Sequence, residues 1–147
     1  MNDSVILLQG NQAIDDRGSV SFVNDFSLNK FNRFYAVENH SRGFVRAWHG
    51  HKEEAKAVTV IAGTALVCAV KIDNWEVPST DLRVERFVLS AHQPAVLLIP
   101  PGFANGFMTL TSDAKLLFFS SSTLAQSVAD DFRFPSDYWD PWKVLQR

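Results

Sequence analysis

Short β-forming segments, separated at close intervals by turn residues, most constrain what this chain can fold into. The segments are rich in branched and aromatic side chains, and clusters of Gly, Pro, Asn, Asp and Ser lie between them. They cover residues 5–10, 19–23, 33–39, 43–51, 56–63, 64–72, 82–90, 94–102, 106–112 and 114–122. No long stretch has the 3.6-residue period of a helix, although 123–132 is compatible with one or two helical turns. The pattern predicts an all-β fold, an antiparallel sandwich or barrel.

Composition narrows the class of protein. The chain has 147 residues, 46% of them hydrophobic, so we expect one domain, residues 1–147, with a substantial core. A net charge of −2 gives no sign of a nucleic-acid surface. No apolar run approaches the ~20 residues of a membrane helix, and the N-terminus does not resemble a signal peptide. The single cysteine, Cys68, cannot form an intramolecular disulfide, and this favours the cytoplasm.

The segment RAWHGHKEEAK, residues 46–56, concentrates groups that can do chemistry. His49 and His51 alternate with Gly50, so on a strand both imidazoles face the same side. Such a pair usually suggests a metal site. The spacing from Gly43 through the two histidines and Lys56 to Gly63 resembles the first motif of the cupin superfamily, and PPGFAN (100–105) resembles the second.

The resemblance to cupins also shows where this chain departs from metal binding. In metal-binding cupins a glutamate ligand stands at the position of Lys56, and a histidine ligand stands at the position of Asn105. An ammonium has no lone pair and repels a divalent cation. We therefore expect no metal and no other cofactor, and we expect activity to survive chelation.

Several segments together resemble the nucleotide-sugar epimerases typified by dTDP-4-dehydrorhamnose 3,5-epimerase. They are DDRG (15–18), NHS (39–41), GFVRAWH (43–49), AK followed by AVTVIAG (55–63) and LSAHQPAVLLIPPGFANGFMTLT (89–111). The resemblance spans roughly residues 15 to 120. It implies a cupin-type double-stranded β-helix, or jelly-roll barrel. The aromatic, Pro-rich end, residues 132–147, is expected to form a short irregular or helical strap over this barrel.

The family resemblance implies roles for individual residues. His49 would be the base that removes a proton next to a ketone, and Lys56 would hold the resulting enolate. Arg17 and Arg46 would contact the diphosphate or the sugar. Asn39, Asn105 and Tyr138 complete the expected substrate-binding residues. The chemistry is consistent with this, because a neutral imidazole with an ordinary pKa of ~6.5 can accept a proton near neutral pH.

Three departures from the epimerase pattern point to inversion at one carbon, C3, rather than at two. The family's catalytic tyrosine falls on Phe118, which has no proton to give, so Tyr35, Tyr138 or a water would have to return the proton. The family's AHG is ANG here, and Asn105 cannot titrate. The family's aspartate partner of the base has no clear counterpart. The sequence leaves its replacement open among Asp131, Asp137 and Asp140.

Two alternative functions stay open. The nucleotide-sugar 3,4-ketoisomerases carry RGxHAHK, which RAWHGHK resembles in both histidines, and their RVYYI resembles RFYAV around Tyr35. The ketoisomerase hypothesis makes His51 a second proton-transfer group beside His49. A third reading is a cupin that binds a sugar without catalysis.

The expected partner is a nucleoside-diphosphate 4-keto-6-deoxyhexose, in deoxysugar biosynthesis for a surface polysaccharide or O-antigen. No nucleic acid or membrane is expected as a partner. The sequence does not identify the nucleotide. A homodimer is expected, because relatives exchange N-terminal strands and the segment 19–31 is too apolar to remain an exposed edge.

Overall fold

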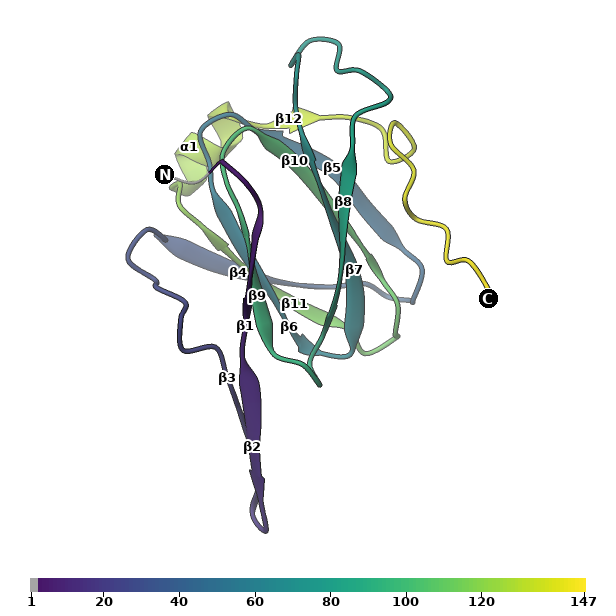
Figure 1. Ribbon diagram of the computed structural model, residues 1–147. Helices are drawn as coiled ribbons and strands as arrows, with labels where there is room; N and C mark the ends of the chain where they lie inside the picture. The colour runs from purple at the N-terminus through teal and green to yellow at the C-terminus, as the bar shows by residue number, and fades with distance from the viewer. Residues whose placement is uncertain (1–2) are drawn as a thin grey trace.

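The computed structural model describes residues 3–147 and confirms the all-β jelly-roll architecture (Figure 1). Two five-stranded antiparallel sheets face each other. The first sheet has the strand order β1-β9-β6-β11-β4, and the second has the order β12-β5-β10-β7-β8. Their strands are β1 (Ile6–Gln9), β4 (Arg33–Glu38), β5 (Val45–His51), β6 (Lys56–Ala62), β7 (Thr64–Lys71), β8 (Val84–Ser90), β9 (Ala95–Ile99), β10 (Phe103–Thr109), β11 (Lys115–Ser120) and β12 (Phe132–Arg133).

The core lies between the two sheets and follows from the alternation of side chains along each strand. Strand β6 contributes Val58 and Val60 from the first sheet, and β10 contributes Phe103 and Phe107 from the second. All four side chains are buried. The central strand β10 has every one of its seven residues buried, because its other face is also covered. This packing fixes the separation of the sheets and therefore of the groups that face each other across it.

The outer face of the second sheet carries a second cluster, which the C-terminal segment covers. Trp48 is completely buried there, in ring contact with Trp139 and Trp142. The indole N–H of Trp48 donates to the carbonyl of Trp139 at 3.0 Å. The expected aromatic strap is therefore present, and it runs along the barrel toward the C-terminus (Figure 1).

A short helix, α1 (Leu124–Ala129), precedes this strap. Thr123 and Gln126 form a capping box at its N-terminus, which satisfies backbone groups that the short helix leaves free. No helix in residues 3–147 is long and apolar enough to cross a membrane.

The hairpin of β2 (Asn11–Asp15) and β3 (Gly18–Phe22) projects away from the barrel (Figure 1). Ile14 and Val20 are 75% and 64% exposed on it. Arg17 lies in the turn at its tip, paired with Asp15 at 2.5 Å. The hairpin therefore presents apolar side chains and a cation outside the barrel that the chain itself forms.

Candidate active site

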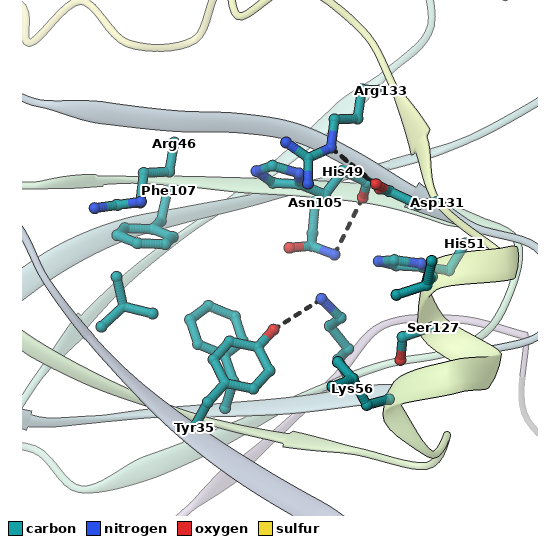
Figure 2. Close-up of a pocket in the computed structure, with 14 residues that line it drawn as sticks. Tyr35, Arg46, His49, His51, Lys56, Asn105, Phe107, Ser127, Asp131 and Arg133 are labelled. Atoms are coloured by element: carbon teal, nitrogen blue, oxygen red, sulfur yellow. Dashed lines mark hydrogen bonds and ion pairs between the residues drawn. The ribbon is translucent and has the colours of Figure 1, made fainter.

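A cavity of about 300 Å³ opens between the two sheets beside α1. Strands β4, β6 and β11 form one wall, β5 and β10 form the facing wall, and α1 with the segment after it closes one end (Figure 2). It is lined by Tyr35, Val37, Arg46, His49, His51, Lys56, Asn105, Phe107, Phe118, Leu124, Ser127, Val128, Asp131 and Arg133.

A β-bulge in β5 brings Arg46 to the same face as the two histidines. Asn105 pairs with His49 and Phe107 pairs with Arg46, so two residues of β5 lie opposite Gly106 alone. Without the extra residue, Arg46 and His49 would point to opposite faces of the sheet. A side chain at position 106 would meet Ala47, with the two Cβ atoms only 2.4 Å apart. Glycine is therefore the residue that allows the bulge to approach β10.

The wall formed by the first sheet carries a tyrosine and a lysine that contact each other. Lys56 Nζ donates a hydrogen bond of 2.8 Å to the hydroxyl of Tyr35. Tyr35 and Phe118 are direct cross-strand partners, and their rings stack at 5.2 Å with an interplanar angle of 7°. The only phenol of this wall therefore comes from β4, the strand next to the one that carries Phe118.

On the facing wall, His49 is neutral at physiological pH. Burial is the main cause that lowers the pKa of His49, to about 4, and the positive charges of Arg133 and Lys56 contribute. The negative charge of Asp131 acts in the opposite direction. Of the three aspartates that the sequence leaves open as partner of the base, only Asp131 lines the cavity.

His51 lies deeper than His49, and only 6% of it is exposed. Its Nδ1 is 2.6 Å from the backbone carbonyl oxygen of Asp130. A carbonyl can only accept, so Nδ1 carries the proton in the neutral ring and Nε2 is left as an acceptor. Burial lowers the pKa of His51 below its ordinary value, with a smaller contribution from Lys56. The neutral ring therefore offers Nε2 as its basic atom.

Comparison with known proteins identifies the family. The family model for dTDP-4-dehydrorhamnose 3,5-epimerase matches residues 3–135. The chain belongs to this family. It is thus homologous to dTDP-4-dehydrorhamnose 3,5-epimerases, which are isomerases. Curated protein sequences gave no significant match.

Solved structures share the fold of this chain. A dTDP-4-dehydrorhamnose 3,5-epimerase from Bacillus anthracis, with TDP and PPi bound, is 22% identical with a TM-score of 0.76, over 97% of this chain and 86% of that one. ChmJ, a 3'-monoepimerase from Streptomyces bikiniensis in complex with dTDP-quinovose, is 21% identical with a TM-score of 0.75, over 97% and 79%. A mutant of the QdtA 3,4-ketoisomerase from Thermoanaerobacterium thermosaccharolyticum, in complex with TDP, is 19% identical with a TM-score of 0.69, over 95% and 94%.

The structure brings six of the sequence-predicted site residues of this family member into one cavity. They are Tyr35, Arg46, His49, His51, Lys56 and Asn105. Asn39 lies behind them: its Oδ1 accepts from Arg46 Nε at 2.8 Å, so it orients a cavity residue rather than lining the cavity.

Besides Asn39, two further predicted substrate-binding residues are not in this cavity. The ring of Tyr138 packs in the outer cluster against Trp139, and its hydroxyl donates to the carbonyl of Pro78. Arg17 is at the hairpin tip, with its side chain 87% exposed. Tyr138 therefore does not reach this cavity, and Arg17 does not line the cavity of its own chain.

Sequence reasoning missed the groups that close the end of the cavity. Leu124, Ser127 and Val128 come from α1, and Arg133 follows in β12. Arg33 on β4 anchors the helix, because its Nη2 donates to Ser127 Oγ at 2.7 Å. The sequence predicted the helical turns, but no pattern in it indicated that they would lie beside the histidines.

The two positions that differ from metal-binding cupins are occupied by internal contacts. Lys56 Nζ bonds to Tyr35, and Asn105 Nδ2 donates to the carbonyl of His49 at 3.3 Å. Within residues 3–147, no three His, Cys, Asp or Glu side chains are grouped so that they could hold a metal ion. Lys56 offers only donors where a metal would require a lone pair, and the amide nitrogen of Asn105 is held by the backbone of His49.

Proposed function

We propose that this protein epimerises a nucleoside-diphosphate 4-keto-6-deoxyhexose at C3 through an enolate. The single observation that carries this proposal is the division of the cavity into two walls. The imidazoles come from β5, and the Tyr35–Lys56 pair comes from the facing sheet (Figure 2). Epimerisation needs a base on one face of the sugar and an acid on the other, and facing walls supply both.

Each step of the reaction has a group with suitable chemistry. His49, neutral because its pKa is lowered to about 4, removes the C3 proton. Lys56 donates to the O4 enolate, and a preorganised donor of this kind can contribute about 3–4 kcal/mol to the transition state. Tyr35 returns the proton from the opposite wall. The hydrogen bond from Lys56 to the Tyr35 oxygen stabilises the phenolate that this transfer leaves behind.

The diphosphate is assigned to the cationic side of the cavity. Arg46 and Arg133 line this side, and Asn39 fixes the guanidinium of Arg46. Arg17 can join them only from the hairpin of a second copy, so we propose a homodimer. Support for a nucleotide-sugar substrate comes from the TDP and dTDP-sugar ligands of the similar structures. Synthesis of a surface polysaccharide or O-antigen is the proposed context.

A 3,4-ketoisomerase is the second candidate, and His51 favours it. Its Nε2 is buried and has no hydrogen-bond partner among residues 3–147, although the ring lines the cavity. A second basic atom beside His49 suits an enediol that must exchange protons at neighbouring carbons.

Product analysis in D₂O separates the candidates. Purified protein is incubated with thymidine-, cytidine- and guanosine-linked 4-keto-6-deoxyhexoses in turn, and ¹H and ¹³C NMR follow the sugar. An epimerase places deuterium at C3, inverts that carbon and leaves the carbonyl at C4. A carbonyl that moves to C3 supports the ketoisomerase, and no exchange with any of the three sugars contradicts both.

The variant His49→Asn tests the assignment of the base. We expect it to abolish deuterium exchange but to leave nucleotide-sugar binding within about three-fold, because the base acts mainly in the transition state. Exchange by NMR and binding by calorimetry measure the two properties. Exchange at near the unmodified rate would place the base elsewhere, at His51 first.

A further inference from the structure

Glu54 is a buried carboxylate that the proposed reaction does not use. Its side chain is completely buried in the turn between β5 and β6. Oε2 accepts from Ser120 Oγ at 2.5 Å, and Arg33 Nη2 is 4.0 Å away. Oε1 has no hydrogen bond within residues 3–147 and lies 3.4 Å from Nδ1 of His51. Burial of a carboxylate is costly, so its position beside an imidazole requires an explanation.

Asp130 holds both Glu54 and His51 in this arrangement. Its carboxylate accepts the backbone N–H groups of Lys52, Glu53 and Glu54 at 2.8, 2.8 and 3.0 Å. These bonds fix the turn that carries Glu54. The backbone carbonyl of Asp130 accepts from Nδ1 of His51 at 2.6 Å. One residue at the end of α1 therefore sets the ring orientation of His51 and places the carboxylate next to it.

We propose that Glu54 is a positioning residue: its carboxylate, 3.4 Å from Nδ1 of His51, favours the tautomer in which Nδ1–H donates to the carbonyl of Asp130 and Nε2 is a proton acceptor in the cavity. The proposal rests on the second candidate of the proposed function, the 3,4-ketoisomerase, in which the sugar reacts in this cavity. His51 then acts as a second proton-transfer group beside His49, and Glu54 is its counter-ion. The arrangement follows the general pattern of a base oriented by a third group.

The charges around His51 determine what Glu54 contributes. When Nε2 accepts a proton, the imidazolium lies near the positive charge of Lys56, which disfavours it. Glu54 and Asp130 act in the opposite direction. Because both side chains are buried, a carboxylate at 3.4 Å from the ring has a stronger electrostatic effect than it would have in water. Without Glu54, the protonated ring of His51 would still be near the positive charge of Lys56 but would have lost the nearby carboxylate that stabilises it.

The first test is the tautomer of His51 in the unmodified protein. Two-dimensional ¹H–¹⁵N NMR of the histidine rings, with His51→Asn for assignment, reports which nitrogen carries the proton. We expect Nδ1–H, with a non-protonated Nε2. An Nε2–H tautomer would overturn the proposal. This measurement needs no substrate, so its outcome is independent of whether the nucleotide-sugar reaction is found.

The second test removes the charge of Glu54 and keeps its shape. Glu54→Gln should lower the pKa of His51 in an NMR titration, because the anion that favours the imidazolium is lost. The kcat of deuterium exchange should fall about 10- to 100-fold. This is less than the roughly 10²–10⁴-fold that a general acid or base contributes, because Glu54 acts only through His51. KM should stay within about two-fold, because Glu54 does not touch the substrate. Glu54→Asp, which retains the charge, should recover part of kcat.

Glu53→Gln is the matched control, because Glu53 is exposed in the same turn and its backbone bonds to the same aspartate. It should change neither the pKa of His51 nor kcat. In a His51→Asn background, Glu54→Gln should have no additional effect on kcat, because Glu54 acts through His51. Equal effects of the two glutamine variants, or a full additional loss in the His51→Asn background, would contradict the proposal.

Discussion

Tyr35 places a phenol hydroxyl in the cavity from the strand next to Phe118. They are cross-strand partners on β4 and β11 with stacked rings. If Tyr35 returns the proton, Tyr35→Phe should still wash deuterium into C3 but should invert that carbon at least about 100-fold more slowly. NMR distinguishes exchange with retention from exchange with inversion. Phe118→Tyr in the Tyr35→Phe background should restore part of the inversion. Inversion by Tyr35→Phe at the unmodified rate would exclude this tyrosine.

The lowered pKa of His49 has a definite consequence for the pH profile. A base must be unprotonated, and a group with a pKa of about 4 stays unprotonated down to mildly acidic pH. We expect kcat/KM to stay level from pH 8 to pH 6 and to fall only as pH approaches 4. Asp131→Asn should move this acidic limb to still lower pH, because the carboxylate raises the pKa of His49. A limb near the ordinary histidine pKa of ~6.5 would contradict the assignment of His49.

Sequence patterns could place individual reactive residues where spacing is short and the strand is regular. His49 and His51 share a face because one residue separates them, and they do line one cavity. Arg46 could not be placed in this way, because the bulge opposite Gly106 changes the alternation. Tyr138 lies in a Pro-rich irregular segment without periodicity, so nothing in the sequence fixed its direction. The hydrogen bond of its hydroxyl to Pro78 instead ties the strap to a distant loop.

At the scale of elements, the adjacent Asp130 and Asp131 at the end of α1 have different environments. Asp130 is buried and accepts three backbone N–H groups from the turn after β5. Asp131 is exposed to the cavity and contacts Arg133 at 3.0 Å. The sequence identified Asp131 as one of three candidate partners of the base. It could not reveal the hydrogen bonds from the turn to Asp130, because they join segments almost 80 residues apart.

This difference predicts that substitution of Asp130 affects mainly stability and that substitution of Asp131 affects mainly activity. Asp130→Ala should lower the free energy of unfolding by about 2–4 kcal/mol, because buried N–H groups lose their acceptor. Asp131→Ala should change it by less than about 0.5 kcal/mol and should instead slow deuterium exchange. Urea unfolding followed by tryptophan fluorescence measures the first property, and NMR measures the second. Equal stability of the two variants would show that the turn does not depend on Asp130.

At the scale of the whole molecule, the barrel could be predicted from the sequence. The positions of the C-terminal strap and of the hairpin outside the barrel could not. Turn residues and β-forming segments are local signals, so the all-β class could be inferred from them. The position of the strap over the second sheet depends on Trp48, which the bulge directs outward to meet Trp139 and Trp142. The hairpin of β2 and β3 likewise projects from the barrel with Ile14 and Val20 exposed, and no local pattern in the sequence reveals this placement.

The hairpin leads to the prediction that the protein is a homodimer in which each chain completes the other's site. Ile14 and Val20 are mostly exposed, and Arg17 is at the tip, away from the cavity of its own chain. Burial of these apolar side chains requires a second surface. Light scattering at micromolar concentration should therefore give twice the chain mass of 16.5 kDa. Val20→Glu should shift the protein toward the monomer and weaken binding of TDP.

Complementation between two inactive variants tests whether Arg17 acts in the partner's cavity. Arg17→Ala leaves His49 intact, and His49→Asn leaves Arg17 intact. In a mixed dimer, the cavity that keeps His49 receives Arg17 from the other chain, so one of its two sites is complete. Random mixing makes about half of all dimers mixed, so exchange should recover to about one quarter of the unmodified rate. The matched control is Val20→Glu introduced into both chains, which should prevent recovery. If the mixture recovers nothing while light scattering shows mixed dimers, Arg17 does not act across the interface.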